Sequence, residues 1–87
     1  MLNVRVIYMG RGYDAAQSLP EHLCLPDGAT LDDALAAIRG HLPADHPLSA
    51  SCLIAVSGVH LGTMADHRSK TLNDGDELLL LAPVAGG

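Results

Sequence analysis

The chain has 87 residues, a length that allows one domain with a single compact core. Its formal net charge is −5, and its aromatic residues are Tyr8 and Tyr13, with no Phe or Trp. This composition excludes single-stranded nucleic acid binding, which needs a positive groove and aromatic platforms. An acidic surface instead favours a basic protein partner.

The sequence also bears on the cellular compartment. No segment approaches the roughly 20 apolar residues of a membrane-spanning helix. The first residues lack the uninterrupted apolar core of a signal peptide. We therefore expect a cytoplasmic protein that does not engage a membrane. Cys24 and Cys52 stand singly, without CxxC spacing, which predicts a pair of buried thiols.

Two strands are predicted before residue 26. Residues 2–9 alternate with period two, so that Leu2, Val4, Val6 and Tyr8 face one way and Asn3, Arg5, Ile7 and Met9 the other. The glycines at 10 and 12 break this strand, and residues 13–18 are expected to be irregular. Residues 19–25 predict a second strand, followed by a turn at residues 26–28.

A helix is predicted to begin after Thr30, which occupies the N-cap position. Asp33 stands where a capping box places its acidic partner, and Asp32 adds negative charge that suits the helix dipole. Apolar residues recur at helical spacing and form one stripe toward the core: Leu31, Ala34, Leu35 and Ile38. Gly40 fits the position after the helix, and Pro43 prevents its resumption.

The remaining elements are strands. After a loop over residues 41–50, residues 51–57 predict a third strand, and Gly58 turns the chain into a short strand at residues 59–61. Residues 62–71 are expected to be irregular. The last strand is predicted over residues 78–82, and its four consecutive leucines indicate a central strand that is covered on both faces.

One amphipathic helix and one mixed sheet form a natural two-layer domain. We therefore expect an α+β fold over residues 1–82, with a mixed sheet packed on one main helix. Residues 83–87 are expected to leave the sheet as a flexible tail.

The end of the chain carries a family resemblance. Residues 71–87 run through Asn73-Asp74-Gly75-Asp76-Glu77 and the leucine strand to Pro83-Val84-Ala85-Gly86-Gly87. This stretch resembles the end of the MoaD/ThiS family of ubiquitin-like sulfur carriers. Residues 26–31 and 51–58 are similar to that family too. The chain length favours its MoaD branch, the small subunits of molybdopterin synthase.

The resemblance implies a ubiquitin-like β-grasp fold and a mechanism that uses the C-terminal carboxylate of Gly87. An activating enzyme would adenylate this carboxylate with ATP and magnesium, and a sulfur donor would displace AMP to leave a thiocarboxylate. The sulfur would pass to an acceptor in a partner, which in molybdenum cofactor biosynthesis is the large synthase subunit with its cyclic pyranopterin. The chain would be the sulfur-donating subunit of a sulfurtransferase complex, without catalytic side chains, a stably bound cofactor or a metal.

The residue types of the tail suit insertion into another protein's active site. Glycine has no Cβ, so Gly86 and Gly87 can pass through a narrow channel and lie against a nucleotide. Pro83 stiffens the point where the tail leaves the sheet and cannot extend its hydrogen-bond ladder. Val84 and Ala85 would follow it into the partner.

A partner interface is expected on the last strand. We expect Leu79 and Leu81 to face away from the helix, beside Ile7. Exposed contiguous apolar area usually marks an interface, so these three residues are the expected contact surface for a partner. The acidic residues before the strand are expected to be turn and surface acids that face a basic partner: Asp74, Asp76 and Glu77. The histidines lack the spacing of a zinc site and are expected to be solvated: His22, His41, His46, His60 and His67.

Two departures from the family pattern bear on the choice of partner. Leu81-Ala82 stand where many molybdopterin-branch carriers have aromatics, and residues 10–14 lack a helical Arg-Glu-Leu pattern. Two alternatives stay open: a sulfur carrier for thiamin, cysteine or a secondary metabolite, and a ubiquitin-like modifier that forms isopeptide bonds with lysines. The Gly-Gly end serves all three functions, because adenylation precedes each.

Overall fold

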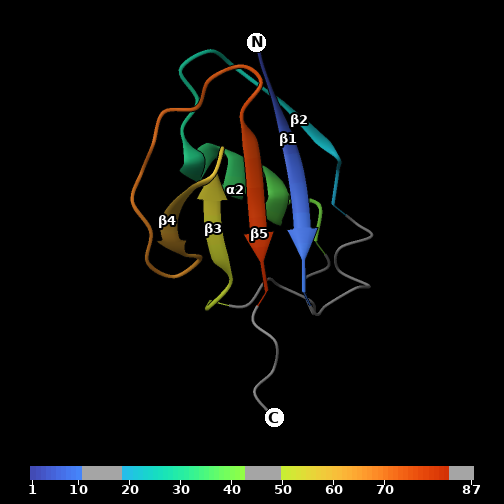
Figure 1. Ribbon diagram of the computed structural model, residues 1–87. Helices are drawn as coiled ribbons and strands as arrows, with labels where there is room; N and C mark the ends of the chain where they lie inside the picture. The colour runs from blue at the N-terminus through green and yellow to red at the C-terminus, as the bar shows by residue number, and fades with distance from the viewer. Residues whose placement is uncertain (11–18, 43–49, 83–87) are drawn as a thin grey trace.

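The computed structural model describes residues 1–10, 19–42 and 50–82. Within these ranges the elements are β1 (Leu2–Met9), β2 (His22–Leu25), α2 (Leu31–Arg39), β3 (Leu53–Val56), β4 (Val59–Thr63) and β5 (Glu77–Leu81). The strands form one sheet in the order β2-β1-β5-β3-β4, and α2 packs across one face of it (Figure 1).

The sheet is mixed, as predicted. β1 and β5 run parallel, while β1–β2, β3–β4 and β3–β5 are antiparallel pairs. β5 therefore lies in the centre, between the first strand of the chain and the third. Both the α+β class and the central position of the last strand are confirmed.

The hydrophobic core lies between the sheet and α2. The helix contributes its predicted stripe, Leu31, Ala34, Leu35 and Ile38, and each of these side chains is at most 1% exposed. The sheet contributes the helix-facing residues of its central strands, including Val4, Ile54, Val56, Leu78 and Leu80. A nine-residue helix is marginal in isolation, so this burial supplies most of the stability of α2.

The N-terminus of α2 has the predicted capping box. The Thr30 side chain accepts a hydrogen bond from the Asp33 N–H at 3.4 Å, and the Asp33 carboxylate accepts one from the Thr30 N–H at 2.9 Å. Gly40 follows the helix, as expected, but with a right-handed φ of −65°. That position therefore does not depend on the left-handed conformation that glycine allows.

Some element limits differ from the sequence prediction. β2 begins at His22 rather than at residue 19, because Pro20 has no N–H with which to continue the ladder to β1. β4 extends to Thr63, where Gly62 forms a bridge with His67 in a segment that was expected to be irregular. β3 is shorter than predicted at both ends.

α2 covers one face of β5, as predicted: Leu78 and Leu80 are fully buried, whereas Leu79 and Leu81, on the face expected to meet a partner, are partly exposed. The prediction of two buried thiols is wrong for one of them. Cys52 is buried, but Cys24 is exposed. Cys24 lies opposite Asn3 on the face of the sheet that points away from α2.

Candidate functional site

The face of the sheet that points away from α2 carries a cluster of apolar side chains, which we call the outer patch. Two registers assemble it: Leu79 lies between Ile7 of β1 and Ala55 of β3, and Leu81 lies between Met9 and Leu53. Neighbouring strands are about 4.8 Å apart and residues two apart along a strand about 6.6 Å, so the side chains of the two rows are contiguous. Met9 is 54% exposed and Leu53 36%, and the other four side chains are partly exposed.

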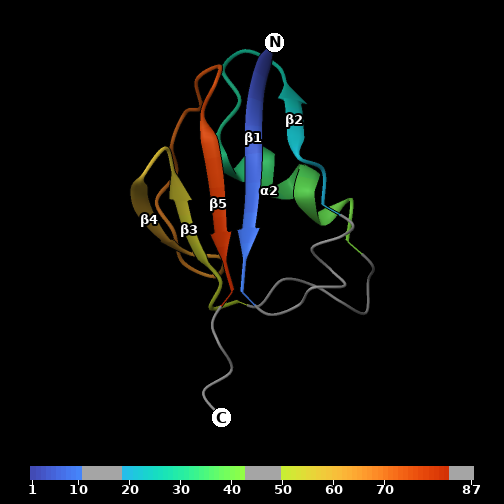
Figure 2. The ribbon, with the colours of Figure 1, turned by 45° about the vertical axis from the view of Figure 1, so that its right-hand side comes forward.

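The outer patch lies at one end of the molecule. Its members on β1 and β5 are the last residues of these strands, and parallel strands end at the same edge of a sheet. Figure 2 shows the arrowheads of β1 and β5 side by side and pointing the same way. The Ala82 N–H donates to the Met9 carbonyl at 2.8 Å, which holds the chain beside the patch until the last described residue.

The structure places the three residues expected at the partner interface, Ile7, Leu79 and Leu81, side by side in this patch. Sequence reasoning did not assign Met9, Leu53 and Ala55 to it. The alternation of residues 2–9 puts Met9 on the same face as Ile7, and this signal could have found it. The two β3 residues join the patch only through strand pairing, which no local pattern encodes. The predicted tail residues, Pro83 to Gly87, lie outside the described residues.

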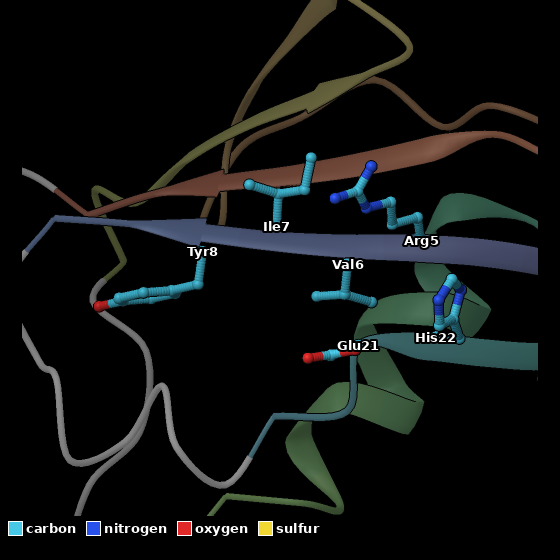
Figure 3. Close-up of a pocket in the computed structure, with 6 residues that line it drawn as sticks. All are labelled: Arg5, Val6, Ile7, Tyr8, Glu21 and His22. Carbon is cyan, nitrogen blue, oxygen red and sulfur yellow. The ribbon is translucent and has the colours of Figure 1, made fainter.

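The other end of the same face is polar. Arg5 Nη1 lies 3.9 Å from Glu77 Oε2, and their side chains are 63% and 50% exposed, so the pair contributes little stability. Beside Arg5, a depression of about 540 Å³ opens along the edge of β1, where Glu21 and His22 begin to pair with it (Figure 3). The depression is open and of mixed polarity, unlike the enclosed, mainly apolar sites that hold small ligands.

Two of the acids predicted in the turn before β5 hold that turn in place. Asp74 Oδ1 accepts the Asn3 N–H at 2.8 Å. Asp76 accepts the Asn73 N–H and the Ser57 hydroxyl, each at 2.8 Å. Burial alone would raise the pKa of Asp76, but these hydrogen bonds and the charge of Lys70 outweigh it and lower that pKa. The acids at 74 and 76 therefore have a structural role.

His67 is not solvated, contrary to expectation. Its side chain is 11% exposed, and Nε2 lies 2.7 Å from Asp32 Oδ1 while Nδ1 lies 2.9 Å from the Thr63 carbonyl oxygen. The hydrogen bond to Asp32 is the largest cause of a raised pKa for His67. No group of three or more His, Cys, Asp or Glu side chains among the described residues could hold a metal ion.

In residues 1–10, 19–42 and 50–82, no helix is long and apolar enough to cross a membrane. The distinctive feature of this part of the chain is the partly exposed outer patch at the end of β1 and β5.

Sequence comparison identifies relatives over nearly the whole chain. Residues 6–87 match the model of the ThiS family. The chain is 27% identical over 86 residues to a Chlamydomonas reinhardtii protein named molybdopterin synthase sulfur carrier subunit, covering 99% of this chain and all of that protein. It is also 33% identical over 70 residues to an uncharacterized protein of Archaeoglobus fulgidus, covering 76% of this chain and 75% of the relative.

Solved structures show the same fold. The H. volcanii small archaeal modifier protein 1 superposes with a TM-score of 0.68 at 19% identity, covering 97% of this chain and all of that one. A second Haloferax volcanii protein, solved in solution, gives a TM-score of 0.65 at 19% identity, covering 99% of this chain and 87% of its own. At this identity the likeness establishes the ubiquitin-like fold alone.

Proposed function

Since the chain belongs to the ThiS family, within the MoaD/ThiS group of ubiquitin-like sulfur carriers, we propose that it carries sulfur as a thiocarboxylate on Gly87. We propose further that it acts as the small subunit of a molybdopterin synthase. The full-length similarity to the Chlamydomonas subunit supports this branch of the family over thiamin or cysteine biosynthesis.

The proposed chemistry takes place on the main-chain carboxylate. A carboxylate oxygen of Gly87 attacks the α-phosphorus of ATP in the activating enzyme, and magnesium pyrophosphate leaves. A donor of sulfur at the oxidation level of sulfide then attacks the acyl carbon, and AMP leaves. The thiocarboxylate sulfur then bonds to a carbon of the acceptor in the synthase, from which an oxygen group leaves, and a thioester forms. Water hydrolyses the acyl–sulfur bond, so that the sulfur stays on the acceptor and the carboxylate returns. ATP and magnesium belong to the activating enzyme and not to this chain.

The position of the outer patch is the observation that supports this proposal most strongly. The five residues after Ala82 span at most roughly 17 Å when extended. A partner that binds the patch therefore meets Gly87 within that distance of its contact surface. Docking on the patch converts the reaction of the carboxylate into an effectively intramolecular step, which is the advantage that a carrier needs.

The role of the tail is tested with two variants, one that lacks Gly87 and one that carries an extra alanine after it. Each is incubated with the activating enzyme of the same host, ATP, magnesium and sulfide, and the thiocarboxylate is measured by intact mass. We expect product from the wild type and none from either variant, because both move or replace the reacting carboxylate.

Unfolding curves supply the control for these variants. Both should match the wild type within about 0.5 kcal/mol, since neither change touches the core. An extended chain that is fully active, and whose mass shows that it has kept its extra residue, would contradict the proposed mechanism.

A further inference from the structure

The end of β1 makes an unusually close backbone contact with the end of β5. Gly10, the residue after β1, has a φ of +108°, a conformation that side chains rarely allow. A Cβ added to Gly10 would lie 2.4 Å from the carbonyl oxygen of Ala82 and 3.1 Å from its Cβ. The position therefore requires glycine for its conformation and, independently, for the space that Ala82 occupies.

The carbonyl in contact with Gly10 belongs to the first peptide of the tail, because the Ala82 carbonyl is bonded to Pro83. Ala82, the residue that begins this peptide, is held on both sides. Its N–H donates at 2.8 Å to the carbonyl of Met9, the residue before Gly10, and Ala82 is only 8% exposed. Gly10 lies close to its carbonyl, where an added Cβ would clash.

Proline limits how Ala82 could respond to a displacement. A residue that precedes proline is restricted to extended conformations, and the proline ring fixes its own φ near −65°. A side chain at position 10 would push the Ala82–Pro83 peptide. The restricted backbone of Ala82 and the fixed φ of Pro83 cannot rotate easily to restore the original direction of the chain. The displacement would be passed on to the tail.

From this geometry we propose that Gly10 is a positioning residue for the sulfur-carrier reaction, which fixes the direction in which the tail leaves the outer patch. The inference rests on the proposed function of Gly87. The contact fixes where the Ala82 carbonyl points, and so the place from which the five residues that carry Gly87 start. Misplacement of a reacting group by about 1 Å can cost on the order of 100-fold in rate.

The test compares Gly10→Ala with Gly28→Ala in adenylation by the activating enzyme of the same host. Gly28 has a φ of +86°, and a Cβ added to it would meet no atom within 4 Å, so its substitution causes similar backbone strain without a clash. For Gly10→Ala we expect kcat to fall about 10-fold or more, with KM within about twofold because the patch is intact. Gly28→Ala should keep the wild-type kcat and KM.

A second variant, Ala82→Gly, guards against misfolding of Gly10→Ala. It frees the residue before Pro83 without introducing a clash, and it too should lower kcat at unchanged KM. Hydrogen exchange of the Ala82 amide, protected in the wild type by its bond to Met9, reports the anchor directly. Wild-type kcat in a folded Gly10→Ala, or in Ala82→Gly, overturns the positioning role alone. A wild-type chain that is never adenylated overturns the proposed function, and the positioning role with it.

Discussion

Leu78 and Leu79 are identical side chains one peptide apart, and the pleat of β5 gives them opposite environments. Leu78 is fully buried against α2, whereas Leu79 lies partly exposed between Ile7 and Ala55. The same contrast separates Leu80 from Leu81. Each pair therefore offers a matched test of whether the outer patch is a binding surface or simply part of the core.

Leu79→Asp should weaken binding to the activating enzyme at least about 10-fold and cost little stability, because the new carboxylate stays in contact with water. Leu78→Asp should instead destabilise the domain by more than about 4 kcal/mol, since it places a charge in the core. Binding is measured by titration calorimetry and stability by denaturant unfolding. Unchanged binding in a folded Leu79→Asp variant would show that the patch is not a binding surface, and a loss of stability as large as that of Leu78→Asp would show that it belongs to the core.

At the scale of elements, the connection from β4 to β5 wraps around the N-terminus of α2. The Leu31 N–H donates to the Lys70 carbonyl at 2.8 Å, and the Leu72 N–H to the Ala29 carbonyl at 2.9 Å. His67 adds a side-chain contact to Asp32 in the first turn of the helix. Sequence patterns could not show this contact, because its partners lie 35 residues apart and neither belongs to a motif.

Protonation of His67 should stabilise this connection. Both ring nitrogens face acceptors, so the imidazolium fits the site better than the neutral ring, and the folded pKa is raised above its ordinary value. The stabilisation is therefore fully present below about pH 6.5 and is lost as the pH rises through the folded pKa.

Denaturant unfolding at about pH 5.5 and about pH 8.5 measures this effect, which should be on the order of 1 kcal/mol. Asp32→Asn should remove most of the difference, whereas Glu21→Gln, a matched change on the exposed Glu21, should preserve it. An equal pH dependence in the Asp32→Asn variant would show that another group is responsible.

The elements differ in how far sequence could predict them. The strand over residues 2–9 and the capped helix follow from local alternation, helical spacing and Thr30, and the structure confirms them. The four leucines of β5 carry no periodicity, so their orientation depends on α2 and the neighbouring strands. The complete outer patch depends on pairing between β1, β5 and β3, and such long-range register leaves no local signal.

For the molecule as a whole, the outer patch and Ala82 lie at one end of the sheet, while the charged pair of Arg5 and Glu77 lies toward the other end. The function proposed above is that of a carrier whose chemistry takes place inside its partners.

The central claim is that Gly87 becomes a thiocarboxylate. It is tested most directly by the intact mass of the chain purified from its own host. The account predicts a species heavier by the difference between one sulfur and one oxygen atom, which disappears when Gly87 is deleted. Higher-mass species in which this chain is joined to lysines of other proteins, with no sulfur-containing form, would contradict the claim and identify a protein modifier.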